Sequence, residues 1–279
     1  MIPQRFINEW RGHVVWQTDA LIEQDLVICR ALIDIYSHPL LAQRVAFRGG
    51  TALHKLFLLG DNRYSEDIDL VEIQPEPIGE TFNLLREVLD PWLGTPQRKL
   101  KDGRANLYYR FKTEGITPIN LRLKIEINTR EHFSTMPYQQ INFQCNSSWY
   151  NKNADITTFH LNELLATKLR ALYQRKKGRD LFDLAVSTKH SDFDGDILVK
   201  NFEKYLTQEN KRVTKAIFEE NLYHKLRDPV FSSDIYPLLK PNSNWDPEIS
   251  AQLVHQHLLN KLTGDSWAGG DVAFAYKQG

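Results

Sequence analysis

The chain has 279 residues, and its 35 Lys and Arg residues are balanced by 35 Asp and Glu residues, so net charge does not identify a nucleic-acid or membrane partner. The hydrophobic fraction of 42% and the charged fraction of 25% are typical of a globular protein with one large domain or two ordinary ones. Two distant cysteines argue against a disulfide framework, and the absence of an apolar signal core or membrane-length run predicts a cytoplasmic protein without a membrane partner.

The first half of the chain predicts a mixture of helices and strands. Helical spacing of apolar residues, with Gly60 ending one segment and prolines following another, predicts helices over 1–44, 51–59 and 78–92. Runs of apolar residues or residues alternating with polar ones predict strands over 45–48, 66–73, 106–112, 119–128 and 139–144. The third and fourth of these strands are expected to form a hairpin around residues 113–118.

The pattern changes to helices alone after about residue 159. Apolar periodicity predicts helices over 161–174, 179–187, 195–206, 209–226 and 248–262. The chain is therefore predicted to have an α+β fold, with a mixed sheet flanked by helices in a domain over 1–158 and a C-terminal helical domain over 159–279.

Two aspartates mark the strand expected at 66–73. Asp67 and Asp69 are two residues apart, so both carboxylates project from one face while Ile68 and Leu70 project into a core. Carboxylates that share a face repel each other unless a cation lies between them, and hard oxygen ligands of this kind suit Mg²⁺ or Mn²⁺. An ordinary exposed strand face is the alternative for two such acids taken alone.

A diglycine turn precedes the helix expected at 51–59. Gly49 and Gly50 allow backbone N–H groups to approach a phosphate closely, and Thr51 stands where the helix begins. The threonine hydroxyl is expected either to cap the helix or to contact a phosphate, which Lys55, one turn further on, would also reach. Together with the aspartates, this turn predicts a site for a metal-bound nucleoside triphosphate.

Glu126 is the candidate for a third carboxylate ligand. In the strand at 119–128 apolar residues alternate with Arg122, Lys124, Glu126 and Asn128, so one face is core and the other polar. A third acid on a neighbouring strand is what metal-dependent phosphoryl transfer needs. The alternative is an exposed sheet face on which Lys124 and Glu126 are ordinary surface charges.

Lys168 lies on or beside the apolar stripe of the helix expected at 161–174. A lysine in that position needs an anionic partner, either a carboxylate or a triphosphate, unless its side chain reaches solvent. The acids that follow have simple alternatives, since Asp180 would also serve as a helix N-cap and Asp183 would also pair with Arg179.

Basic residues are concentrated in two stretches that a polyanion would use. Residues 95–130 contain nine Lys and Arg residues against three acids, and residues 163–179 contain six against one. A solvated surface is the alternative for the first stretch. In the second, Arg175, Lys176, Lys177 and Arg179 are expected to contact phosphates of a nucleic acid or to form a solvated turn.

The motifs together resemble a known family. FRGGTALHKL…RYSEDIDL is similar to the glycine-turn and aspartate-x-aspartate signature of the nucleotidyltransferase superfamily. With KIEI and ELLATKLRAL…RKKGRDLFDL, the chain resembles the AbiEii/AbiGii nucleotidyltransferase toxins of toxin–antitoxin and abortive-infection (phage-defence) systems over roughly residues 40–190.

The resemblance implies a role for each matching residue. Asp67 and Asp69 match the metal-binding acids, Glu126 the third acid, and Ser65 a hydroxyl position beside the site. Lys168 matches the lysine that contacts the triphosphate, and Asp180 or Asp183 matches the acid that follows it. Thr51 replaces the family's usual serine and keeps the hydroxyl, although the gap to the aspartates is longer than in the simplest superfamily members.

The function implied by the resemblance is transfer of a nucleotide from an NTP to RNA (EC 2.7.7-type chemistry), in several members to the tRNA 3′ acceptor end. It also implies an antitoxin partner. Two alternatives stay open from the sequence: nucleotidylation of a protein hydroxyl, and a catalytically silent module that binds RNA or protein.

Overall fold

The structure is a computed structural model that describes residues 1–59, 63–101, 103–114 and 117–269. The chain folds into two compact units, Met1–Phe159 and His160–Gly279. The expected helix end at Gly60 and the centre of the expected hairpin turn, residues 115 and 116, lie outside the described residues.

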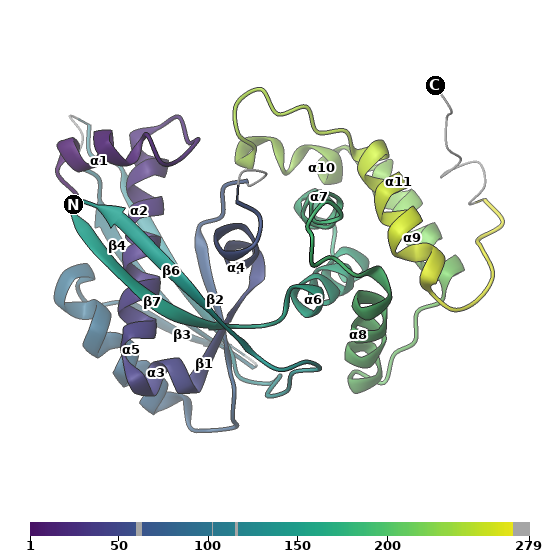
Figure 1. Cartoon of the computed structure of the whole chain (residues 1–279), viewed down its shortest axis with the longest axis horizontal. Coiled ribbons are helices and arrows are strands. Elements are labelled where there is room, and N and C mark those ends of the chain that lie inside the picture. The colour runs from purple at the N-terminus through teal and green to yellow at the C-terminus, as the bar shows by residue number, and fades with distance from the viewer. Residues whose placement is uncertain (60–62, 102, 115–116, 270–279) are drawn as a thin grey trace. The chain divides into compact units, whose positions relative to one another are not determined.

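A mixed seven-stranded sheet forms the centre of the first unit (Figure 1). Its order is β3-β4-β5-β2-β1-β7-β6, in which β2 pairs with β5 and β1 with β7 in parallel, while the other neighbours are antiparallel. The strands are β1 (Val45–Arg48), β2 (Asp67–Glu72), β3 (Gln97–Lys101), β4 (Arg104–Lys112), β5 (Asn120–Asn128), β6 (Gln139–Ser147) and β7 (Tyr150–Thr158). The predicted α+β class with a mixed sheet is confirmed.

Two strands were not predicted, because neither has the apolar alternation that identifies a strand in a sequence. The segment QRKLK of β3 contains one apolar residue and is exposed along its whole length at the sheet edge. The segment YNKNADITT of β7 is mostly polar but pairs with β6 over nine residues. Backbone pairing with a neighbour, rather than side-chain pattern, defines both strands.

Five helices among the described residues of the first unit pack against this sheet (Figure 1). They are α1 (Gln4–Trp10), α2 (Asp19–Ser37), α3 (Pro39–Arg44), α4 (Gly49–Leu56) and α5 (Ile78–Leu93). The helix predicted over 1–44 is therefore three helices, because Thr18 caps the start of α2 and Pro39 begins α3. The hydroxyl of Tyr109, from the apolar side of β4, donates to Asp90 of α5 at 2.9 Å.

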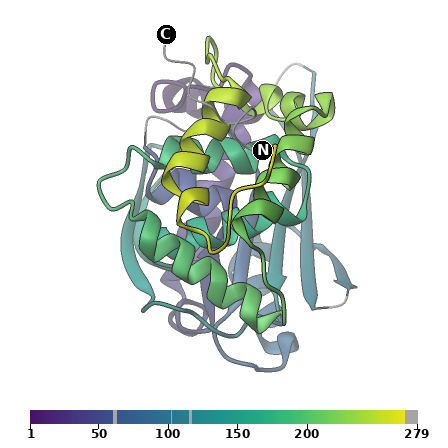
Figure 2. The same cartoon turned by 90° about the vertical axis from the view of Figure 1, so that its right-hand side faces the viewer.

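The second unit contains helices and no strand in its described residues (Figure 2). They are α6 (Leu161–Gln174), α7 (Gly178–Ser187), α8 (Gly195–Gln208), α9 (Lys215–Leu226), α10 (Pro229–Ser233) and α11 (Pro247–His257), with two short 3₁₀ segments. The helix predicted from 209 begins later, at Lys215, because Asn210 has a positive φ and Thr214 supplies the N-cap. The helix predicted to 262 ends at His257.

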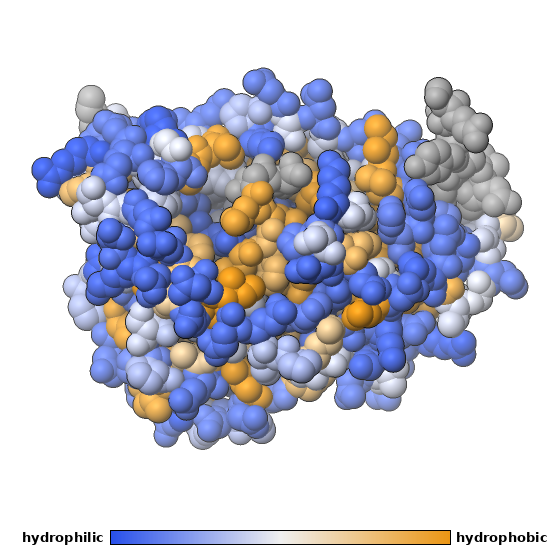
Figure 3. All heavy atoms as spheres, in the orientation of Figure 1, coloured by the Kyte–Doolittle hydropathy of each residue, from blue (hydrophilic) through white to orange (hydrophobic). Residues whose placement is uncertain are grey.

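Each unit buries its own apolar core. Ile68, Leu70 and Ile125 are buried in the sheet unit, and Leu169 and Phe218 are buried in the helical unit. On the molecular surface, hydrophilic residues predominate over the face drawn in Figure 3. Among the described residues, none of the helices combines the length and apolar composition that crossing a membrane requires.

Candidate active site

Carboxylates from two neighbouring strands meet on the polar face of the sheet. The parallel register of β2 and β5 places Asp69 opposite Glu126 and Asp67 opposite Lys124. Ile68 and Leu70, between and after the aspartates, are buried on the opposite face. The alternation of β2 and β5 therefore gathers the three acids predicted from the sequence, because directly opposite residues in paired strands share a face.

Gly49 approaches the Asp69 carboxylate so closely that a side chain does not fit. Its φ is +83°, and a Cβ built on it would lie 2.2 Å from Asp69 Oδ2. The contact follows from the antiparallel register of β1 and β2, in which Arg48, the residue before Gly49, lies opposite Asp69. Only glycine combines this backbone conformation with this approach.

Hydroxyl groups join the start of α4 to the start of β2. Thr51 is buried, its Oγ1 lies 2.8 Å from Ser65 Oγ, and it donates to the backbone carbonyl of Asp67 at 2.5 Å. Thr51 is not the N-cap, because α4 begins at Gly49 with Arg48 as its N-cap residue. The threonine hydroxyl therefore fixes the distance between the glycine turn and the aspartate strand.

Lys124 places a positive charge among these carboxylates. Its Nζ lies 2.8 Å from Glu126 Oε2 and 3.4 Å from Asp67 Oδ2. From the sequence, Lys124 was assigned no role in the site and was named only in the alternative of an exposed sheet face. Its position two residues before Glu126, on the same strand face, was the available signal.

Burial and charge change the pKa values of the same groups. Burial raises the pKa of Asp69, and the neighbouring charges of Asp67 and Glu126 raise it further. Burial also raises the pKa of Asp67, although Lys124 acts in the opposite direction. Burial alone would lower the pKa of Lys124, but its hydrogen bond with Glu126 and the charge of Asp67 raise it above its ordinary value. The carboxylates thus favour a cation beside them.

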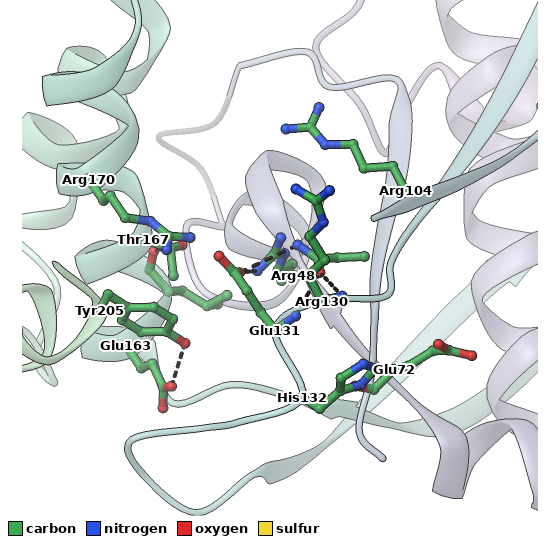
Figure 4. Close-up of polar contacts among 12 residues, drawn as sticks. Arg48, Glu72, Arg104, Arg130, Glu131, His132, Glu163, Thr167, Arg170 and Tyr205 are labelled. Atoms are coloured by element: carbon green, nitrogen blue, oxygen red, sulfur yellow. Dashed lines mark hydrogen bonds and ion pairs between the residues drawn. The ribbon is translucent and has the colours of Figure 1, made fainter. Parts of the chain in front are cut away.

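An ion pair stabilises the turn from β1 into α4. Arg48 donates to Glu131 at 2.6 Å (Figure 4). Glu131 follows β5, and its backbone N–H donates to Asn128 Oδ1 at 3.0 Å, which fixes the loop after that strand. Neither Arg48 nor Glu131 was predicted from the sequence, because a pair separated by 83 residues gives no local signal.

Lys55 has a protein partner that was not predicted from the sequence. Its Nζ forms an ion pair with Asp25 of α2 at 2.9 Å and lies 3.3 Å from Cys29 Sγ. Burial lowers the pKa of Lys55, but the charges of Asp25 and Cys29 and the hydrogen bonds to both side chains together raise it above its ordinary value. Lys55 therefore joins α4 to α2 in this structure.

The oxygen ligands of the sheet site suit a hard divalent cation, although the described side chains are not arranged around a common metal position. Among the described residues, no group of three or more His, Cys, Asp or Glu side chains is placed to hold a metal ion. Asp67, Asp69 and Glu126 are nevertheless oxygen donors whose own repulsion a cation would relieve. These residues would hold such an ion, with Lys124 as its competitor for Asp67 and Glu126.

A second charged cluster lies wholly inside the helical unit. Lys168 Nζ lies 2.8 Å from Asp183 Oδ2 and 3.3 Å from Asp180 Oδ1, and all three side chains are buried. Burial raises the pKa of Asp180, but the charges of Lys168 and Arg175 lower it below its ordinary value. The anionic partner required by Lys168 is thus a pair of carboxylates here, and Asp180 is not the N-cap of α7, because Lys177 occupies that position.

The basic turn before α7 is largely neutralised. Arg175 donates two hydrogen bonds to Asp180, at 2.7 and 2.8 Å. Lys176 pairs with Asp228 at 2.9 Å, and Lys177 lies 3.9 Å from Asp234.

In the same unit, the Tyr205 hydroxyl donates to Glu163 while the Arg170 guanidinium stacks over the Tyr205 ring (Figure 4).

A glycine turn closed against an aspartate-x-aspartate strand, with a third acid opposite on a parallel strand, defines a nucleotidyltransferase-like fold. A family model, "Nucleotidyl transferase AbiEii toxin, Type IV TA system", matches residues 30–257. The chain therefore belongs to the AbiEii nucleotidyltransferase toxin family of type IV toxin–antitoxin systems. Membership implies an NTP substrate, a divalent cation and an antitoxin partner.

Solved structures show the same fold at low sequence identity. MenT4, a nucleotidyltransferase toxin from Mycobacterium tuberculosis H37Rv, is 17% identical with a TM-score of 0.67, and the match covers 99% of this chain and 94% of MenT4. JHP933 from Helicobacter pylori is 20% identical with a TM-score of 0.56, covering 88% of this chain and 95% of that one. A putative nucleotidyltransferase from H. pylori is 21% identical, also with a TM-score of 0.56, covering 90% and 100%. No curated protein sequence matches the chain.

Proposed function

We propose that this toxin transfers a nucleotide from an NTP to RNA, with the 3′ acceptor end of tRNA as the acceptor. The observation that carries the proposal is the register pair Asp69–Glu126, with Asp67 on the same face and Gly49 closed against Asp69. This arrangement leaves no room for a side chain at Gly49 and gathers negative charge beside the glycine turn. Such a site suits a substrate that arrives with a bound cation.

The chain's own residues would position and orient the reacting groups. Gly49 and Gly50 would present backbone N–H groups at the start of α4 to the phosphates, and the Thr51–Ser65 hydroxyl pair would hold that turn at a fixed distance from Asp67. A divalent cation held by Asp67, Asp69 and Glu126 would supply neutralisation of phosphate charge. The remaining contribution is positioning of the acceptor hydroxyl in line with the phosphate that it attacks.

The helical cluster contributes a separate prediction. Asp180 and Asp183 hold the Lys168 ammonium in one orientation, which supports a role for Lys168 as a fixed positive group. The expected contact of Lys168 with the triphosphate stays a prediction, as does the expected contact of Lys55 and of Arg175, Lys176, Lys177 and Arg179 with phosphates. An antitoxin that counteracts the transfer activity is proposed as the partner.

Labelling of RNA by each of the four radioactive NTPs tests the function. The wild-type protein should label purified tRNA in the presence of Mg²⁺ or Mn²⁺. Asp67→Asn should reduce the rate about 100-fold or more, because a charged ligand of the cation that would neutralise the transferred phosphate is lost. Asp155→Asn is the matched control, since Asp155 is an exposed aspartate on β7 of the same sheet.

The outcomes separate the proposal from its alternatives. Label that survives RNase in a cell extract would assign the acceptor to a protein hydroxyl. Absence of heat on calorimetric titration with Mg²⁺–NTP would indicate a silent binding module. Equal labelling by wild type and Asp67→Asn, with both folded by circular dichroism, would contradict the assigned site.

A further inference from the structure

We infer that the polar face of strands β3, β4 and β5 binds the single-stranded 3′ segment of the RNA acceptor, an inference that rests on the proposed function. We call this surface the basic sheet face, and it consists of Lys99, Lys101, Arg104, Arg110, Lys112 and Arg122. The surface continues directly into the carboxylate site, because Lys124 and Glu126 lie on the same face of β5.

Strand register places these residues on one side of the sheet. Lys101 lies opposite Arg104 and Arg110 lies opposite Arg122, so the basic residues of three strands share a face. The alternate residues of the same strands, among them Leu107, Ile125 and Ile127, are buried in the core. Strand pairing therefore joins basic residues from separate parts of the sequence into one contiguous surface.

The positive charge of this face is mostly uncompensated. In the part of the chain that the structure describes, Lys99, Lys101, Arg110, Lys112 and Arg122 form no ion pair with an acidic side chain, and all five are exposed. The basic turn at 175–177 differs, because each of its three residues has an acidic partner. A polyanion gains more from charges that are not already paired, so the sheet face is the better phosphate-binding surface.

Two uncharged side chains add features that suit nucleotides. The half-buried ring of Tyr108 lies beneath the Arg122 guanidinium, 5.3 Å from the ring centroid, which makes a platform on which a base can stack. Asn106 lies opposite Glu126, is only 6% exposed, and its Oδ1 has no hydrogen-bond partner among the described residues. A buried acceptor beside the carboxylate site is suited to a ribose 2′-hydroxyl of the acceptor's last nucleotides, a group that DNA lacks.

The dimensions of the face fit a short segment. Three interstrand steps separate β3 from β2, or roughly 14 Å at the usual strand spacing. That length accommodates about four phosphates of a stacked single strand. We therefore assign to the face a few unpaired nucleotides that end in the reacting 3′-hydroxyl.

Fluorescence anisotropy with a 12-nucleotide unstructured RNA, labelled at its 5′ end, tests this inference on the full-length protein. The variant Lys99→Gln/Arg110→Gln/Arg122→Gln removes three charges from the face. For this variant, the slope of log Kd against the logarithm of the salt concentration should be smaller than that of the wild type by about 2. Each lost phosphate contact on a single strand contributes about 0.7 to that slope. The control Lys189→Gln/Lys200→Gln/Lys204→Gln removes three exposed charges from the helical unit and should keep the wild-type slope. Equal slopes for the two triple variants would overturn the inference.

Single substitutions test the nucleotide-specific contacts. Tyr108→Ala should weaken RNA binding about tenfold, and Tyr108→Phe should retain the wild-type Kd, because stacking needs the ring and not the hydroxyl. Asn106→Leu should weaken binding of the RNA while leaving the Kd for a DNA oligonucleotide of the same sequence unchanged. Parallel losses for RNA and DNA would contradict the ribose contact.

Binding and transfer fail in different ways. If the wild type binds the oligonucleotide through this face but labels no RNA, the proposed function is wrong and the surface assignment stands. If the wild type labels RNA while the sheet-face triple variant keeps its Kd, its salt slope and its labelling rate, the function stands and the surface assignment is wrong.

Discussion

The ammonium group of Lys124 contacts the carboxylates of both Glu126 and Asp67, at 2.8 and 3.4 Å. The lysine thus supplies to two of the candidate ligands the positive charge that a divalent cation would supply. Cation binding would have to displace these ion pairs. The relationship predicts that Lys124 lowers the cation affinity of this site.

Replacement of Lys124 by methionine should therefore increase the affinity for Mn²⁺. We expect a gain of about fivefold, because a partly buried ion pair of about 1 kcal/mol no longer competes. Calorimetric titration with MnCl₂ measures the effect, and Lys124→Arg, which keeps the charge, is the control. Weaker binding by Lys124→Met than by the wild type would show that the lysine assists the cation.

Replacement of Gly49 by alanine should remove nucleotide binding and destabilise the fold. The new Cβ would overlap Asp69 Oδ2 at 2.2 Å, and alanine at φ +83° adds about 1–2 kcal/mol of backbone strain. Gly79→Ala is the control, because nothing lies within 4 Å of its Cβ position and it is in helix α5. Thermal unfolding should show a lower Tm for Gly49→Ala and a higher one for Gly79→Ala. Unchanged Mg²⁺–NTP binding by Gly49→Ala would count against the glycine turn as the phosphate site.

Replacement of Lys168 by methionine should destabilise the helical unit. Asp180 and Asp183 are fully buried, so loss of the ammonium leaves two carboxylates close together without it, at a cost of about 3–5 kcal/mol. Urea unfolding measures the change, and exposed Lys200→Met should alter stability by about 0.5 kcal/mol or less. Adding Asp183→Asn to Lys168→Met should recover part of the loss, and a further loss in the double variant would contradict the pairing.

The same cluster predicts how stability depends on acid. The pKa of Asp180 is lowered in the folded state, so the unfolded chain takes up its proton first as pH falls. The stability from Asp180 is complete above the ordinary aspartate pKa of about 3.9 and is lost as pH falls through the lowered folded value. Urea midpoints between about pH 2 and 6 should fall less steeply with acid for Asp180→Asn than for the wild type. Identical acid dependence would show that Asp180 does not titrate with folding.

The placement of three acids on one face of the sheet was largely predictable because its signals are local. Asp67 and Asp69 lie two apart in one strand, and Glu126 lies in a strand with clean alternation. The sequence around each strand does not show that the two strands are neighbours. The structure shows that they pair, in a register that places Asp69 opposite Glu126. The alternation of residues along a strand predicts which face of the sheet each side chain occupies, but only the tertiary structure shows which strands are neighbours.

The contacts that sequence reasoning missed join distant segments. The phosphate contact of Lys55 stays a prediction, but its ion pair with Asp25 was not predicted, because Asp25 belongs to a different helix. Strand β3 escaped prediction because its side chains are nearly all polar, while its identity depends on pairing with β4. Neither fact is visible without the three-dimensional arrangement.

Strand β3 also has a consequence for how copies of the toxin meet. It lies at the end of the sheet, so its outer backbone N–H and C=O groups face no further strand in the described order. Such an edge is a template for self-association, yet Arg98, Lys99 and Lys101 would bring like charges together if two copies paired there. The strand that we assign to RNA thus also protects the protein from aggregating through its open edge.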